Sequence, residues 1–248
     1  MITLDLVYWL AGAYLLAVAA LGLRDRHNPR RHTTALFWGL LGAMFLAADR
    51  LPPALVGAVV VLLACLAGFG GLARGRYEET STADREAEAR RLGNRLFWPA
   101  LLIPAVCVLF AVVLKDLRIG ERFLLGREHT TLVALGIACV VAAIAACRLT
   151  RQSPWSAVEQ SRRLIDAVGW AALLPLLLAT LGSVFAAAGV GDAVAGLVRM
   201  AIPVDNRFVV VAAYAIGMAL LTIIMGNAFA AFPVLTAGIG LPLLVQRH

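Results

Sequence analysis

Residues 225–240, MGNAFAAFPVLTAGIG, interrupt an otherwise apolar region with residue types that open a helix. Gly226 and Asn227 end helices readily, because both tolerate the left-handed backbone conformation. Pro233 suits the first turn of a new helix, where its missing N–H costs nothing. The pattern predicts a broken helix near 226–233. Opened backbone of this kind can bind an anion at a half-helix N-terminus and a cation through freed carbonyl groups.

We place a substrate-binding site around this break. Asn227 would contribute its side-chain amide, and Pro233 would begin a half-helix whose N–H groups face a small carboxylate. Thr222 and Thr236 would offer hydroxyl groups beside the opened backbone at Gly226. The alternative is a glycine-rich helix end that Asn227 merely caps. Three further polar residues are candidates for coupling to an ion, with helix capping as the alternative role: Asp192, Asp205 and Asn206.

The composition requires that these residues be held by membrane helices. Of the 248 residues, 61% are hydrophobic and 15% are charged, and the mean hydropathy is +0.85. A soluble domain needs a more polar shell. The sequence therefore predicts an integral membrane protein of the all-α class, a polytopic transmembrane bundle with seven or eight membrane segments.

Apolar runs of spanning length give the positions of these segments. The run 193–203 is too short to span and predicts an interfacial or re-entrant helix. No sequence repeat is visible, so we expect one transmembrane domain over 1–248. The expected spans are 2–23, 33–48, 54–73, 96–114, 131–147, 167–191, 208–225 and a less regular 228–245.

The distribution of basic residues predicts the orientation. Loops 24–32, 74–95 and 148–166 together hold fourteen Lys and Arg residues, against seven in the remaining loops between the spans. Because basic loops stay in the cytoplasm, the N-terminus is expected outside. In loop 74–95, Glu and Arg alternate at helical spacing, which predicts a short solvated helix in the cytoplasm.

Several functional classes are disfavoured by the motifs. The sequence has no HExxH motif, no GxSxG elbow and no Walker loop, so we expect no enzyme activity. The net charge of +7 is explained by orientation in the membrane, so nucleic acid is not an expected partner. Neither a metal nor an organic cofactor is expected, apart from sodium or a proton as coupling ion.

Three stretches carry a family resemblance: IPVDNRF, GMALLTIIMGNAFAAFPVLTAGIGLPLLV and GWAALLPLLLATLGSVFAAAGVGD. They resemble a bacterial family of permease-like inner-membrane proteins of unknown function. Its members are often encoded beside a second membrane protein and enzymes of 5-oxoproline metabolism. The likeness is closest over residues 165–245. It implies a role in transport, related to ion-coupled organic-anion transporters, and a C-terminal segment beyond Val245 that this chain lacks.

The sequence and the resemblance together favour one subunit of a secondary transporter in the bacterial inner membrane. Its substrate would be a small carboxylate, with 5-oxoproline as the first to test. Membrane lipid would surround it, and either a second copy or another membrane subunit would cover the opened backbone. The alternative is a non-transporting scaffold or assembly partner whose glycine-rich helices exist for packing.

Overall fold

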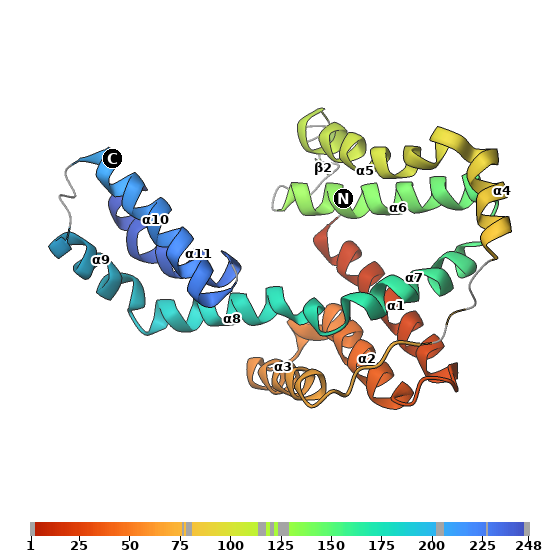
Figure 1. Cartoon of the computed structure of the whole chain (residues 1–248), viewed down its shortest axis with the longest axis horizontal. Helices are drawn as coiled ribbons and strands as arrows, with labels where there is room; N and C mark the ends of the chain where they lie inside the picture. The colour runs from red at the N-terminus through yellow and green to blue at the C-terminus, as the bar shows by residue number, and fades with distance from the viewer. Residues whose placement is uncertain are drawn as a thin grey trace. The chain divides into compact units, whose positions relative to one another are not determined.

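The structure is a computed structural model that describes residues 3–75, 77, 81–113, 118–119, 122–123, 129–201, 206–226 and 228–245. Figure 1 follows the chain from its red N-terminal helices to its blue C-terminal helices. The backbone divides into two compact units, Met1–Trp170 and Ala171–His248. Within the expected single membrane domain these units are taken in turn.

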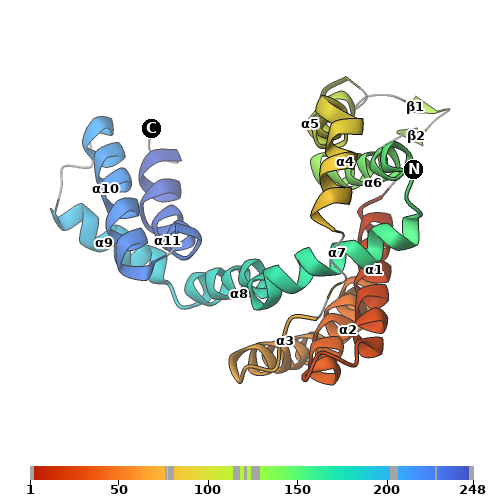
Figure 2. The same cartoon turned by 45° about the vertical axis from the view of Figure 1, so that its right-hand side comes forward.

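The N-terminal unit begins with a hairpin of two helices, α1 (Leu4–Arg24) and α2 (Arg31–Ala47), which lie side by side in Figures 1 and 2. Glycines allow a close crossing. A Cβ atom at Gly12 would lie 2.8 Å from the carbonyl oxygen of Gly42, and one at Gly42 would lie 3.0 Å from that of Gly12. Small residues let apolar helices pack tightly where lipid removes the usual hydrophobic drive.

The next helix, α3 (Pro53–Gly68), starts at a proline and ends in a Schellman motif. The N–H of Gly71 donates to the Leu66 carbonyl, and the N–H of Gly70 donates to the Ala67 carbonyl. Gly70 adopts a φ of 69°, which favours glycine. The motif reverses the chain sharply, so that the residues after Gly71 run back past the start of α2.

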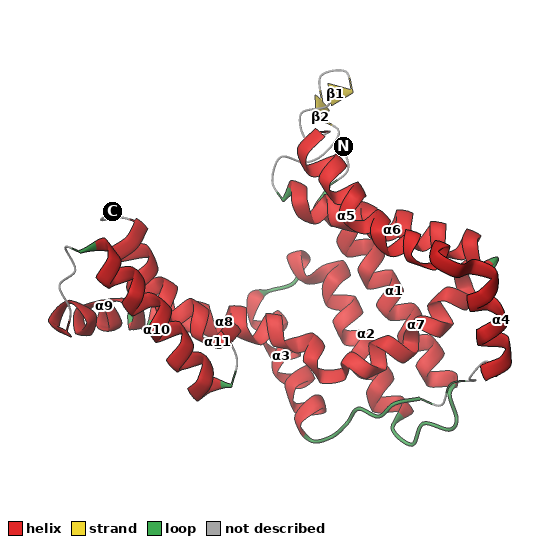
Figure 3. Cartoon of the chain, turned by 45° about the horizontal axis from the view of Figure 1, so that its top comes forward, coloured by secondary structure: helices red, strands yellow, loops and turns green. Residues whose placement is uncertain are grey.

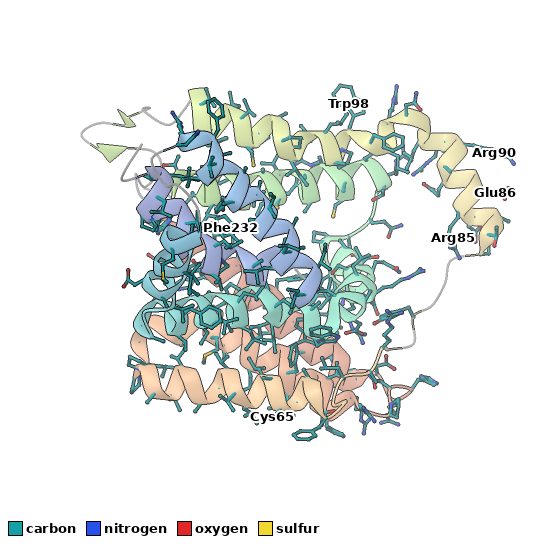
Figure 4. All side chains as sticks on the ribbon, turned by 60° about the vertical axis from the view of Figure 1, so that its left-hand side comes forward. Cys65, Arg85, Glu86, Arg90, Trp98 and Phe232 are labelled. Carbon is teal, nitrogen blue, oxygen red and sulfur yellow. The ribbon has the colours of Figure 1, made fainter. Side chains whose placement is uncertain are left out.

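The charged helix α4 (Thr82–Leu92) confirms the short helix predicted in loop 74–95. Ser81 caps it by accepting a hydrogen bond from the N–H of Asp84 at 3.1 Å. Arg90 pairs with Glu86 one turn away, and in Figure 4 both side chains point away from the ribbon.

Two apolar helices, α5 (Trp98–Val108) and α6 (Thr130–Thr150), pack side by side, and α7 (Pro154–Val168) contacts both α6 and α1. Pro104 lies inside α5, which continues as a π-helix, η3 (Leu109–Val113). Figure 3 shows the two short strands in yellow. These strands are β1 (Arg118–Ile119) and β2 (Arg122–Phe123), and the 3-10 helices are η1 (Ala48–Arg50), η2 (Gly93–Phe97) and η4 (Gly169–Leu173).

The C-terminal unit packs short and long helices around one apolar core. Its core residues are Val210, Leu235, Ile239 and Leu243, each at most 4% exposed. The helices α9 and α10 both pack against the final π-helix, and α10 also packs against α11. The elements are α8 (Leu174–Ala187), α9 (Val190–Ala201), α10 (Arg207–Met225), α11 (Ala228–Leu235) and the π-helix η5 (Thr236–Val245).

The predicted all-α membrane class is confirmed. Four helices among the described residues are long and apolar enough to cross a membrane: Leu4–Arg24, Thr130–Thr150, Pro154–Phe185 and Arg207–Ile224. Pro53–Gly68 and Ala231–Val245 are shorter apolar helices. Large apolar side chains face outward, as lipid contact requires, including Trp98 at 65% exposed and Phe232 at 54%, which Figure 4 labels.

Two local predictions are corrected. Pro233 does not begin a half-helix, because α11 already starts at Ala228 and Pro233 lies inside it. The predicted broken helix near 226–233 is present, since α10 ends at Met225 and a separate helix, α11, starts at Ala228. Asp192 does not cap the short helix near 193–203 either, because α9 begins at Val190 and contains Asp192 in its first turn.

Candidate functional site

The predicted substrate-binding residues start at the end of α10. Gly226 takes the left-handed conformation expected for a helix-ending glycine, with φ 68° and ψ 5°. It is exposed, and a Cβ atom placed on it would meet no heavy atom within 4 Å. Thr222 lies one turn earlier on α10 and is half-buried. Asn227 lies outside the described residues.

Thr236 does not lie near Gly226. Its hydroxyl is 3.2 Å from the hydroxyl of Tyr214, and the Tyr214 ring would lie 3.4 Å from a Cβ atom on Gly240. Tyr214 and Gly226 are both in or at the end of α10, about 18 Å apart along its axis at 1.5 Å per residue. The structure therefore separates Thr236 from Gly226 and Thr222, so the predicted residues do not form one compact site.

The ion-coupling candidates also take distinct positions. The side chain of Asn206 caps α10, accepting a hydrogen bond from the N–H of Phe208 at 3.0 Å, which confirms the capping alternative. Asp205 lies outside the described residues. Asp192 is exposed and follows Gly191, where a Cβ atom would lie 3.0 Å from the Ala237 carbonyl oxygen. Of the three candidates, Asp192 is placed beside the final π-helix.

The final π-helix leaves one carbonyl without its usual donor. In π-geometry each N–H bonds to the carbonyl five residues earlier, and proline has no N–H. Pro242 lies inside η5, so the carbonyl of Ala237 lacks this helical hydrogen bond. A Cβ atom on Gly191 of α9 would lie 3.0 Å from that carbonyl oxygen. A carbonyl oxygen at an apolar helix contact is a candidate ligand for a cation.

A second polar cluster lies in the N-terminal unit, where residues 71–75 are held between other elements. The side-chain amide of Asn28 donates to the Ala73 carbonyl at 2.9 Å, and the N–H of Ala73 donates to the Thr34 hydroxyl at 3.2 Å. Asn28 is 3% exposed and Thr34 is 4% exposed. These bonds fix the segment against the loop between α1 and α2.

The charged part of this cluster joins α1 to α7. Arg162 on α7 is 3.5 Å from Asp25, and their side chains are 9% and 7% exposed. The guanidinium lies 5.7 Å from the centre of the Tyr77 ring. Tyr77 donates its hydroxyl to Asp166, which also accepts from the N–H of Gly75 at 3.2 Å. We call these five residues, Asp25, Gly75, Tyr77, Arg162 and Asp166, the loop cluster.

Two consequences follow from this geometry. Burial, together with the hydrogen bond and negative charge of Asp166, raises the pKa of Tyr77 well above its ordinary value, so the phenol stays protonated. A Cβ atom on Gly75 would lie 2.5 Å from an Asp25 carboxylate oxygen and 3.2 Å from Arg162. Only glycine leaves room for the ion pair at this position. The cluster borders a cavity of about 800 Å³.

Sequence reasoning did not identify the loop cluster. It expected loops 24–32, 74–95 and 148–166 on one side of the membrane, and the cluster takes residues from all three. The available signal was the spacing of Arg162 and Asp166, which places both on one face of α7. Asp25 was harder to recognise, because an acid between two arginines in a loop is normally solvated.

The helices, their outward-facing apolar side chains and the polar cluster at the loops define an all-α, multi-pass integral membrane protein. The chain belongs to the family described as Protein of unknown function (DUF979), whose model matches residues 5–248. No curated protein and no solved structure matches it. The expected membership of an uncharacterised family is confirmed.

Proposed function

We propose that this chain is a subunit of a secondary transporter for a small organic anion, driven by a sodium or proton gradient. The first substrate to test is 5-oxoproline. The protein would lie in the bacterial inner membrane with its N-terminus outside and its three most basic loops in the cytoplasm. It would work without an enzymatic step and without an organic cofactor.

The proposal rests on the interrupted helical backbone near the C-terminus, where one helix ends, a second begins and the chain then changes to π-helix. Helix α10 ends at a left-handed Gly226, α11 begins at Ala228, and the chain then adopts ten residues of π-helix. Long π-helices are rare, and π-turns often mark functional sites. In lipid, irregular backbone is tolerated where protein or water surrounds it, which is how secondary transporters build their substrate sites.

The anion would bind near the break. Residues 208–225 contain no Lys or Arg, so positive charge for a carboxylate would have to come from backbone N–H groups and side-chain amides. Gly226 ends α10, one turn beyond Thr222, and Asn227 is the next residue in the sequence. We therefore propose the side-chain amide of Asn227 as the substrate ligand. Pro233 would act on the shape of α11, and Thr236 would act through its contact with Tyr214 rather than on the anion.

The coupling ion would bind away from the helix break, where α9 packs against the final π-helix. Asp192 supplies an exposed carboxylate one residue after Gly191, and Gly191 lies against the Ala237 carbonyl, which cannot accept a π-helical hydrogen bond from Pro242. A carboxylate and a backbone carbonyl are oxygen ligands of the type that hold sodium, and a carboxylate can also take up a proton. The side chain of Asn206 already caps α10, so we do not propose it as a ligand of the coupling ion.

Uptake into proteoliposomes tests the proposal. Labelled 5-oxoproline and a panel of small carboxylates would be supplied with a sodium gradient, a proton gradient or neither. Asn227→Ala should weaken substrate binding about 5- to 150-fold, since leaving a buried partner unsatisfied costs roughly 1–3 kcal/mol. Asn94→Ala, at an exposed position in η2, is the matched control. Uptake equal to that of empty liposomes for every substrate would refute transport by this chain alone.

A second pair of variants tests the coupling role. Asp192→Asn should remove stimulation by the ion gradient while substrate binding persists. Asp49→Asn, which also neutralises an exposed acid, should leave stimulation unchanged. Equal stimulation in both variants would contradict the assignment of Asp192.

The expected partner is a second copy or another membrane subunit that covers the opened backbone. Cross-linking in membranes followed by size analysis tests this expectation. A chain that stays monomeric and still transports when reconstituted alone would contradict it. The alternative function, a non-transporting scaffold, predicts a stable complex with a partner and no uptake in any combination.

A further inference from the structure

The loop between α1 and α2 borders a second cavity, which is largely open to the surface and has a strongly basic lining. This cavity has a volume of about 900 Å³ and is bordered by Arg24, Arg26, Arg31 and His32. Ligand sites in proteins span roughly 300–1,000 Å³. The feature is independent of the proposed transport site, because all its residues belong to the N-terminal unit.

The only acid in residues 23–32 is turned away from this cavity. One carboxylate oxygen of Asp25 faces Arg162 at 3.5 Å, and the other accepts a hydrogen bond from the N–H of His27 at 3.1 Å. With its side chain only 7% exposed, Asp25 does not neutralise the surface. Arg24 and Arg26 are exposed, so the cavity presents an excess of positive charge.

The loop that carries these arginines is held in place. Asn28 is 3% exposed, and its side-chain oxygen accepts a hydrogen bond from the N–H of Arg30 at 2.8 Å. Its amide group is bound to the Ala73 carbonyl, as described above. Because the loop backbone is fixed at both sides of Pro29, binding would not require ordering of the loop.

The position of the cavity indicates which anion it would meet. Arg24 is the last residue of α1, which is long and apolar enough to cross the membrane. The neighbouring Leu23 also borders the cavity and is 46% exposed. Basic residues at the end of a membrane helix lie at the level of lipid phosphates, while an exposed leucine there contacts acyl chains.

We propose that the cavity formed by the loop 24–32 binds the phosphate headgroup of an anionic phospholipid. Arg26 and Arg31 supply the charges that recognise it, since guanidinium groups pair with phosphate oxygens through two N–H bonds. Both leaflets of a membrane contain lipid headgroups, so the site does not depend on which side of the membrane the loop occupies.

The test is a lipid titration of the purified, detergent-solubilised chain, with bound lipid counted by native mass spectrometry. The probe is phosphatidylglycerol, with phosphatidylcholine as the neutral comparison. Each arginine near a membrane surface contributes about fivefold in affinity, so Arg26→Gln with Arg31→Gln should raise the Kd about thirtyfold. The control, Arg90→Gln with Arg91→Gln on α4, removes the same charge from an exposed helix and should change Kd less than twofold.

A charge-conserving variant and a competition with the free headgroup complete the test. Arg26→Lys with Arg31→Lys keeps the charge and should keep most of the affinity, which separates loss of charge from misfolding. Equal affinity for phosphatidylcholine would overturn the proposal, as would an equal loss in the α4 control. Glycerol phosphate, the free headgroup, should not displace the lipid at matched concentration. If it does, the site takes a soluble phosphate and the lipid assignment is wrong.

Discussion

Replacing Arg162 by methionine removes the cation that faces Asp25 in the loop cluster. Methionine keeps an unbranched apolar stem of similar reach, so the main change is the loss of the guanidinium group. Asp25 would remain with its side chain 7% exposed and without this partner at 3.5 Å. A buried carboxylate deprived of its cation is poorly solvated, so the folded state should lose stability.

The magnitude follows from the distance and the burial. Two unit charges 3.5 Å apart attract each other by about 5 kcal/mol at an effective dielectric constant of 20. Measured losses on breaking one side of a buried ion pair are about 3–5 kcal/mol. In a chain of this length, each 1 kcal/mol shifts the unfolding temperature by roughly 2–4 °C. Arg162→Met should therefore lower it by about 6–20 °C.

Thermal unfolding in detergent, followed by tryptophan fluorescence, provides the measurement. Arg90→Met is the matched control, because its ion pair with Glu86 is exposed and worth at most about 1 kcal/mol. The double variant Asp25→Asn with Arg162→Met should recover part of the loss, since the carboxylate that lost its guanidinium partner is then neutral as well. If Arg162→Met costs no more than Arg90→Met, or if the double variant is the sum of its singles, the ion pair does not hold the cluster together.

Three further predictions concern single positions and use the same measurement. Gly75→Ala should destabilise the fold by roughly 1–3 kcal/mol, because the added methyl group would clash with Asp25. Gly22→Ala is the control: a Cβ atom there meets no atom within 4 Å, so this change should stabilise α1 by up to about 1 kcal/mol. Equal effects of the two changes would contradict the packing argument. The raised pKa of Tyr77 means that the folded state keeps a proton that the unfolded state loses above pH 10.0. The free energy of unfolding should therefore fall as the pH rises beyond that value, by at most about 1.4 kcal/mol per pH unit. The variant Tyr77→Phe should abolish this slope. Asn206→Ala should cost about 1 kcal/mol through loss of the α10 cap and leave ion stimulation of uptake intact; lost stimulation would return Asn206 to the coupling site.

Sequence reasoning located elements wherever the governing interactions are local. The long apolar runs became helices, the alternating charges of loop 74–95 became α4, and Gly226 ended α10 in the expected conformation. Each of these outcomes depends on residues within a few positions along the chain. Hydropathy, helix capping and left-handed glycine are properties of this kind.

The errors arose where a local preference has more than one solution. Pro233 is compatible with a helix start, but a proline inside a helix is also tolerated when a wider turn relieves the missing hydrogen bond, and here α11 passes into π-helix three residues later. Asp192 favours both an N-cap and the first turn of a helix, and Gly189 with its positive φ already provides the reversal before α9. Neither choice is settled by sequence spacing.

The loop cluster was out of reach for a different reason, since its ion pair joins residues that are 137 positions apart in the sequence. Asp25 and Arg162 meet only because α1 and α7 pack together and Gly75 leaves space between them.

The two units use different kinds of polar group. The N-terminal unit uses charged side chains at its loops, where the buried charges of Asp25 and Arg162 are paired with each other. In the C-terminal unit, the final apolar region offers Gly226, the Ala237 carbonyl and the Tyr214–Thr236 pair instead. Backbone carbonyls and hydroxyl groups can hold a small ion in lipid without the insertion cost of a fixed charge, which is the physical reason for proposing the substrate and ion sites there.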